Sequence, residues 1–222
     1  MKATAFVEEL ASYRFENAFN PYADACPDFD TAESPAIRRK NLETVLDAAI
    51  EKGVHSFWIA RDLGYRGGRR TGLALTDELH LDWHADLLGS APLHRATKGP
   101  PVAERTASVV WEMLKSIEQP IFLWNVFPFH PHAAGEPMTN RCHTRRERLA
   151  CKPLLEALIA ALRPKHLVAI GRDAQSALAD LDLDATAVRH PSYGGQNEFI
   201  DAVETFYSVR RRQASPAQLH LL

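Results

Sequence analysis

The sequence predicts an α/β fold, a three-layer α/β/α sandwich around a central four-stranded parallel sheet. Four short apolar runs, each bounded by turn-forming residues, have the length and composition of buried strands. They alternate with segments of helical periodicity, and this alternation favours a parallel sheet covered on both faces. The strands are expected at residues 54–60, 121–126, 166–171 and 185–190.

Three helical segments precede strands, and each stops at a residue that breaks helices. The first ends at Gly53, and the other two end before Pro120 and Pro164. Glycine and proline at these positions are helix stop signals. The helices are expected at residues 36–53, 103–119 and 145–163.

The composition favours a single globular domain that spans residues 1–222. A hydrophobic content of 45% supplies one sizeable core, and a charged content of 24% gives no sign of disorder. No run approaches the roughly 18 apolar residues of a membrane span. The first ten residues, MKATAFVEEL, carry two glutamates where a signal peptide would be apolar. We therefore expect a cytoplasmic protein with no membrane contact.

The cysteines and the net charge exclude several classes. Cys26, Cys142 and Cys151 are scattered and form no C-x-x-C pair, which argues against a disulfide framework or a zinc ribbon. The formal net charge of −2 argues against a strongly basic nucleic-acid coat. Any phosphate binding must therefore come from a local patch. One candidate patch contains Arg61, Arg66, Arg69 and Arg70.

Polar residues and turn formers follow all four predicted strands. In open parallel sheets, ligands bind at the carboxyl ends of the strands, where loops cross the edge. The sequence therefore predicts one shared cleft at this edge. The loops that would form it are residues 61–72, 125–132, 171–177 and 190–196.

Asp62 follows the first apolar strand directly and begins a loop rich in glycine and arginine. A carboxylate there can orient or deprotonate water, or stabilise a positively charged sugar in a transition state. The alternative is a simple ion pair with Arg61 or Arg66.

Asn125 closes the second strand, where a carboxamide fits poorly unless something hydrogen-bonds to it. A carboxamide donates and accepts together, which matches the N–H and carbonyl edge of uracil and mismatches that of cytosine. The alternative is an ordinary turn asparagine.

His190 ends the fourth strand and is followed by Pro191. An imidazole in this position could donate a hydrogen bond to an oxygen on which negative charge grows. The alternative is a structural histidine that bonds only to other protein groups.

Asp62, Asn125 and His190 suggest an enzyme that acts on a sugar–base bond, but two other classes of function remain open on the residues alone. A zinc-dependent hydrolase could use the nitrogen and sulfur atoms of His130, His132, Cys142 and His143 as metal ligands. A binding module could hold uracil-containing DNA or a nucleotide without cleaving it. A carboxylate, an amide and an imidazole at three strand ends favour an enzyme, because binding alone does not require the carboxylate.

Three motifs in one order resemble the uracil-DNA glycosylase superfamily. They are RDLGYRGGRRTGLALTDE at 61–78, LWNVFPFHP at 123–131 and RHPSYGG at 189–195. Any one of them is weak, but three at successive strand ends are fairly specific. The resemblance implies that Asp62 positions water and offsets the sugar cation, Asn125 reads the base, and His190 stabilises the departing uracil anion.

The resemblance also implies an activity and its partner. The protein would flip uracil, or other deaminated bases as well, out of DNA and hydrolyse the N-glycosidic bond in base excision repair. Uracil-containing DNA would be the partner, free uracil the product, and the protein a monomer without cofactor or metal. Base contacts are expected from Ala60, Arg61, Leu63, Gly64 and Leu75. DNA contacts are expected from Arg66, Arg69, Arg70, Ser192, Tyr193 and Gln196, with Tyr193 or Gln196 as the side chain inserted into the duplex.

The sequence departs from the family pattern at several points. Members with an iron–sulfur cluster carry four cysteines, so this chain resembles a bacterial branch that lacks them. Gly64 stands where the best-known branch has a tyrosine that blocks the thymine methyl group, and Leu75 stands near the position of the stacking phenylalanine. Stacking would then come from Phe127, Phe129 or Tyr65. The R-R-I-H motif of the branch that traps uracil-DNA covalently is absent, which favours turnover.

Overall fold

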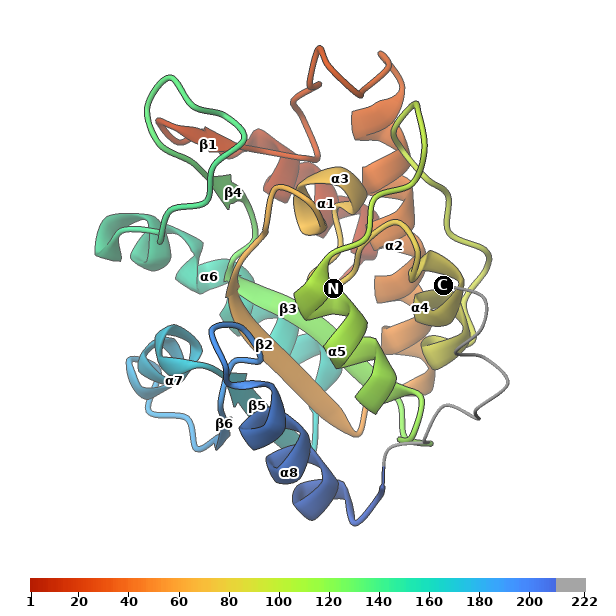
Figure 1. The fold of residues 1–222 in the computed structure, drawn as a ribbon, viewed down its shortest axis with the longest axis vertical. Coiled ribbons are helices and arrows are strands. Elements are labelled where there is room, and N and C mark those ends of the chain that lie inside the picture. Colours follow the sequence, from red (N-terminus) through yellow and green to blue (C-terminus); the bar gives the residue numbers. More distant parts are fainter. Residues whose placement is uncertain (211–222) are drawn as a thin grey trace.

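A computed structural model of the chain describes residues 1–210 and has the expected three-layer α/β/α architecture. The central sheet has four parallel strands in the order β3-β2-β5-β6 (Figure 1). Its strands are β2 (Ser56–Asp62), β3 (Ile121–Phe127), β5 (His166–Ile170) and β6 (Thr186–Val188). A second, two-stranded antiparallel sheet pairs β1 (Ala18–Phe19) with β4 (His130–Pro131).

The three predicted helices are confirmed, and five more accompany them in the described part of the chain. The predicted helices are α2 (Ser34–Lys52), α5 (Arg105–Leu114) and α6 (Arg145–Leu162). The others are α1 (Ala3–Ser12), α3 (Gly68–Thr71), α4 (Leu81–Leu88), α7 (Arg172–Ala179) and α8 (Gln196–Tyr207). Helix α5 ends five residues earlier than position 119, because its last turn tightens into i to i+3 bonds from Ser116 N to Met113 O and from Ile117 N to Leu114 O.

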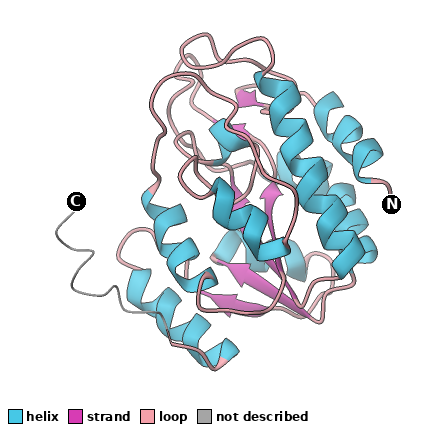
Figure 2. Cartoon of the chain, turned by 90° about the vertical axis from the view of Figure 1, so that its right-hand side faces the viewer, coloured by secondary structure: helices cyan, strands magenta, loops and turns pink. Residues whose placement is uncertain are grey.

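The alternation of side chains along β2 divides the core between two faces of the sheet. Phe57 and Ile59 face a cluster built mainly with α1, α2, α4, α6 and α7. Trp58 and Ala60 face a second cluster, built mainly with α5 and α8. Helices α5 and α8 lie in front of the sheet in Figure 1, and Figure 2 shows helices on both sides of the strands. Both faces of the sheet are therefore covered, as the apolar runs predict.

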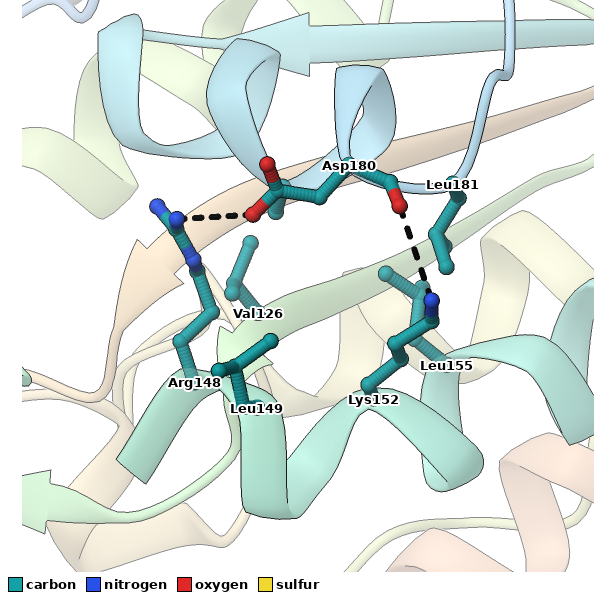
Figure 3. A pocket seen from close by; sticks show the side chains of 8 residues that line it. Val126, Arg148, Leu149, Lys152, Leu155, Asp180 and Leu181 are labelled. Carbon is teal, nitrogen blue, oxygen red and sulfur yellow. Dashed lines mark hydrogen bonds and ion pairs between the residues drawn. The ribbon is translucent and has the colours of Figure 1, made fainter. Parts of the chain in front are cut away.

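Helices α6 and α7 enclose a small apolar pocket on the first of these faces (Figure 3). Arg148 donates to the Asp180 carboxylate at 2.7 Å, and Lys152 Nζ donates to the Asp180 carbonyl at 3.5 Å. The enclosed space of about 10 Å³ holds at most about one water molecule. This pocket is too small for a nucleobase, so it is not a candidate site.

One further contact bears on the position of the strand-end loops. Leu63 N donates to Phe129 O at 3.1 Å, so the loop after β2 is joined to the loop after β3.

No helix within residues 1–210 is both long enough and apolar enough to cross a membrane.

Candidate active site

The carboxyl ends of neighbouring strands bring together the residues singled out by the sequence. Ala60 on β2 lies opposite Asn125 on β3, and Asp62 lies opposite Phe127. On the other side of β2, β5 ends at Ile170, which pairs with Val188 two residues before His190. Asp62 at the end of β2, Asn125 near the end of β3 and the His190 loop after β6 therefore lie along the same carboxyl edge of the sheet.

Hydrogen bonds hold both oxygens of the Asp62 carboxylate. Arg61 Nε donates to Oδ2 at 2.7 Å, and His143 Nδ1 is bonded to Oδ1. The Asp62 side chain is only 4% exposed. A carboxylate with one bond on each oxygen is fixed in orientation and still has free lone pairs for a water molecule. An ion pair with Arg61 was the alternative to a catalytic role for Asp62. The ion pair is present, and it leaves the carboxylate in an orientation that suits such a role.

Arg61 links the Asp62 carboxylate to the His190 loop. Besides its bond to Asp62, its guanidinium lies 3.7 Å from the carboxylate of Asp173, near the start of α7. The positive charge of Arg61 also disfavours protonation of His190. Asp62 and His190 thus share Arg61 as a charged neighbour, although 128 positions separate them in the chain.

The His190 ring is held in one tautomer by Ser192. Its Nδ1 lies 3.2 Å from the backbone N–H of Ser192, which donates to it, and 2.7 Å from Ser192 Oγ. Burial, followed by the positive charges of Arg61 and Arg189, lowers the pKa of His190 to about 4. The neutral ring then carries its proton on Nε2, where it can be donated to a ligand.

Two glycines allow the His190 loop to adopt its conformation. Gly171 has φ +85°, and a Cβ there would stand 3.3 Å from His190 Cβ. A Cβ at Gly195 would collide with the carbonyl oxygen of His190. Both positions therefore require glycine, one for its positive φ and one for close approach of the backbone.

Asn125 is 1% exposed, and its Oδ1 has no hydrogen-bond partner among residues 1–210. Alternation along β3 places its side chain on the face of the sheet that Ala60 and Leu75 also line. A buried polar atom without a partner costs free energy, and such atoms are rare in native proteins. A carboxamide whose Oδ1 has no partner within residues 1–210 is suited to a polar ligand that reaches it.

Three more residues predicted to contact the base are Leu63, Gly64 and Leu75. Leu75 is 9% exposed with φ +54°, and its carbonyl accepts the Trp111 indole N–H at 3.1 Å. Leu63 is buried, and Gly64 packs against the Glu104 carboxylate. Leu75 is therefore held by α5 on the same face of the sheet as Asn125.

The Thr-Asp-Glu segment that ends the first motif organises these loops. Asp77 Oδ2 accepts the backbone N–H of Glu104 at 2.6 Å. Glu78 Oε2 accepts the N–H of Val102 and the Arg70 Nε–H, both at 2.9 Å. Both carboxylates bond to protein groups, so this part of the motif is explained by structure rather than by ligand binding.

The structure corrects the phosphate-binding role expected of Arg69 and Arg70. Arg69 is 3% exposed, contacts His130 Nδ1 at 2.9 Å and stacks on Phe19. Arg70 is 7% exposed and binds Glu78. Both guanidinium groups are buried, because this segment folds inward: Arg70 meets the carboxylate of Glu78, whereas Arg69 meets the ring of Phe19 and the imidazole of His130.

The remaining residues predicted to contact DNA differ in their exposure to solvent. Arg66 is exposed at the surface of the glycine-rich loop. Tyr193 is 98% exposed and adopts φ +50°, whereas Gln196 is partly buried as the first residue of α8. Of the two side chains suggested for insertion into DNA, Tyr193 is the one that projects into solvent.

Two of the three aromatic residues suggested for base stacking belong to the core. Phe127 and Phe129 are buried and pack with Phe15 at 5.0 and 5.4 Å between ring centroids. Tyr65 is partly exposed, and its backbone N–H donates to Asn140 at 3.1 Å. Of the three, only Tyr65 is partly exposed.

The residues considered as zinc ligands do not form a cluster. No group of three or more His, Cys, Asp or Glu side chains within residues 1–210 is arranged to hold a metal ion. His130 bonds to Arg69 and to the Thr139 carbonyl, and His143 bonds to Asp62. The sequence did not single out His143 as a partner of Asp62, because no local pattern links the two residues.

Comparison with known proteins decides the family. The sequence model of the uracil DNA glycosylase superfamily matches residues 86–208, a segment that contains Asn125 and His190. The chain belongs to this superfamily. No curated protein matches the chain.

A solved structure supports the fold. The crystal structure of wild-type SMUG2 from Pedobacter heparinus is similar to this superfamily member with a TM-score of 0.58. The similarity covers 94% of this chain and 98% of the other at 14% sequence identity, so it bears on the fold alone. Asp62 and the first motif precede the segment matched by the family model.

Proposed function

We propose that this superfamily member removes uracil from DNA by hydrolysing the N-glycosidic bond, the step that begins base excision repair. The observation that carries the proposal is the buried Asn125 carboxamide, whose Oδ1 has no hydrogen-bond partner within residues 1–210. It lies at the sheet edge that also carries a fixed carboxylate, Asp62, and a neutral imidazole, His190. Uracil offers an N–H beside a carbonyl, which the carboxamide can pair.

Asp62 would act on the sugar and on the water. As the bond between uracil N1 and sugar C1′ breaks, its electron pair leaves with the base and positive charge develops on the sugar. A fixed carboxylate stabilises that charge and orients water toward C1′. The water proton passes to the carboxylate or to solvent as the C1′–O bond forms.

His190 would act on the leaving group. The electron pair that leaves with N1 delocalises onto the uracil carbonyl oxygens, and the Nε2–H of the neutral ring can donate to one of them. The imidazole keeps its proton and stays neutral in this step. The uracil anion then takes a proton from solvent to give free uracil. Ser192 keeps this tautomer in place through His190 Nδ1.

The exposed loops would hold the DNA. Arg66 is available for a phosphate, and Tyr193 can enter the space left by the flipped nucleotide. Base extrusion costs a few kcal/mol, which these contacts offset. Ala60, Arg61 and Leu63 would line the base site with their backbone.

The test is base release from defined oligonucleotides. Single-stranded and duplex DNA carrying uracil, hypoxanthine, xanthine or mismatched thymine is incubated with the protein, and abasic sites are then cleaved with alkali. We expect strand scission in the uracil lanes. Scission in none of the lanes would refute the proposal, and scission in the other lanes would define further substrates.

A substitution separates catalysis from binding. Asp62→Asn should lower the rate of base release far more than the affinity for uracil-containing DNA. Equal losses in both would favour a binding module instead.

A chelator tests the zinc-dependent alternative. Release of uracil should continue in EDTA, whereas a zinc-dependent hydrolase would lose its activity.

A further inference from the structure

We infer that His143 is a positioning residue for the proposed glycosylase reaction and fixes the Asp62 carboxylate through its Nδ1–H. This inference rests on the proposed function. It adds a residue from outside the three motifs, and it gives His143 a role that does not involve a metal.

The contact between the two residues is buried and supported from a second side. His143 Nδ1 bonds to Asp62 Oδ1, and the two side chains are 3% and 4% exposed. Arg61 holds the other oxygen, Oδ2, at 2.7 Å. A carboxylate held by two donors on different oxygens cannot rotate about its terminal torsion without losing one bond. The two donors therefore fix the direction in which Asp62 presents its remaining lone pairs.

The backbone on both sides of His143 is anchored. Thr144 caps α6, since its Oγ accepts the Glu147 N–H at 3.2 Å and its own N–H donates to Glu147 at 2.6 Å. Arg141 binds the Glu147 carboxylate at 2.6 Å and the Asn17 carbonyl at 3.2 Å. A capping box and a paired arginine thus flank His143 in the sequence. Its ring is delivered to Asp62 by a rigid segment rather than by a free loop.

The ring is oriented by packing as well as by hydrogen bonding. The His143 imidazole lies 5.9 Å from the Phe127 ring, and Phe127 is opposite Asp62 in the sheet register. His143 therefore reaches Asp62 from the side of β3, whereas Arg61 reaches it from within β2. Displacement of a catalytic group by about 1 Å can cost about a hundredfold in rate, so loss of either donor should slow the chemical step.

Matched variants can test which atom of His143 is needed. Asparagine places an amide N–H near the Nδ1 position, glutamine places it near Nε2, and leucine has no donor. We expect His143→Asn to retain uracil release within a few-fold, and His143→Gln and His143→Leu to lose about 10- to 100-fold in the single-turnover rate constant. The Kd for uracil-containing DNA should change little in all three variants.

A double substitution distinguishes positioning from a general structural role. If His143 acts only through Asp62, His143→Leu should cause no further loss of rate in an Asp62→Asn background. Multiplicative losses would overturn the inference, and so would equal rates for His143→Asn and His143→Leu. A parallel loss of DNA affinity would also overturn it, because His143 would then contact the substrate.

A spectroscopic readout keeps this inference separate from the proposed function. In ¹H–¹⁵N spectra, the His143 Nδ1–H should give a downfield resonance that is lost in Asp62→Asn. A wild-type protein that shows this resonance but releases no base would refute the proposed reaction and leave the contact established. Absence of the resonance in a wild-type protein that releases uracil would overturn the role of His143 alone.

Discussion

His190 accepts the backbone N–H of Ser192 on Nδ1 at 3.2 Å, which leaves the proton of the neutral ring on Nε2. Burial, with the charges of Arg61 and Arg189, lowers the pKa of His190 to about 4, well below its ordinary value of 6.5. The imidazole therefore stays neutral from about pH 5 upward. We expect the single-turnover rate of uracil release to show no inflection from His190 between pH 5 and pH 8.

The control for this prediction is His190→Asn, which should lower the rate about a hundredfold to a thousandfold, as expected when one donor to a developing anion is weakened. Rates of the wild type and the variant, measured across the same pH range, show which part of the pH dependence of the rate comes from His190. A wild-type inflection near pH 6.5 that disappears in the variant would show that the imidazole titrates normally.

The sequence predicted the parts of the fold that depend on local patterns. The runs that became β2 and β3 are apolar because both faces of the sheet are covered there, whereas Ala187 on the edge strand β6 is exposed. Helix α2 ends next to Gly53, as its sequence predicted. The placement of Asn125 and His190 at strand ends followed from the same patterns and from the edge rule for parallel sheets.

The parts that the sequence did not predict depend on contacts between distant segments. Arg69 and Arg70 were expected to contact DNA, because nothing local shows that this segment turns inward toward Phe19 and Glu78. His143 lies 81 positions from Asp62, and no spacing rule joins them. The Thr144 capping box was the one local signal that the segment before α6 is rigid.

Asn125 offers a test in which stability and activity change in opposite directions. Its Oδ1 is buried without a partner within residues 1–210, so leucine of similar size should stabilise the fold by about 1 kcal/mol. The same Asn125→Leu substitution should lower uracil release at least about tenfold, because the base loses its paired edge. Urea unfolding and single-turnover assays measure the two effects. A destabilised variant with normal activity would assign Asn125 to the fold.

Tyr193 is 98% exposed at φ +50°, a combination that folding alone does not favour. Tyr193→Gly should leave the protein as stable or up to about 1 kcal/mol more stable, because glycine adopts positive φ without strain. Release of uracil from duplex DNA should fall about tenfold or more, with a much smaller effect on single strands, which need no inserted side chain.

The matched variant is Tyr193→Phe, which keeps the ring and should retain activity on duplex DNA. The ratio of duplex to single-strand rates measures the role of insertion directly. An unchanged ratio in Tyr193→Gly would assign the insertion to another residue.

Arg66 lies in the loop after β2 and Arg70 in the short helix α3 that follows, and the two should respond differently to removal. Arg70 is buried against Glu78 at 2.9 Å, so Arg70→Ala should destabilise the protein by about 3 to 5 kcal/mol. Arg66 is exposed, so Arg66→Ala should change stability by less than about 0.5 kcal/mol. It should weaken DNA binding and reduce the salt dependence of log K for duplex DNA by about 0.9. Equal effects of the two variants on stability would contradict this division.

Glu104 at the start of α5 gives a prediction about pH and stability. Its carboxylate packs against Gly64 and Gly67, and burial, followed by the negative charge of Asp77, raises its pKa from 4.5 to about 7. The folded protein therefore binds this proton more tightly than the unfolded chain. Its contribution to stability falls as pH rises from 4.5 to about 7, and the full cost of ionisation is present above pH 7.

Glu104→Gln removes the ionisation and keeps the shape of the side chain. The variant should be more stable than the wild type at pH 8 by about 1 to 3 kcal/mol, and the difference should shrink toward zero near pH 4.5. Urea unfolding of both proteins at pH 8, 6.5 and 5 measures the trend. A difference that stays constant with pH would mean that the Glu104 carboxyl group ionises at its ordinary pKa beside the glycine-rich loop.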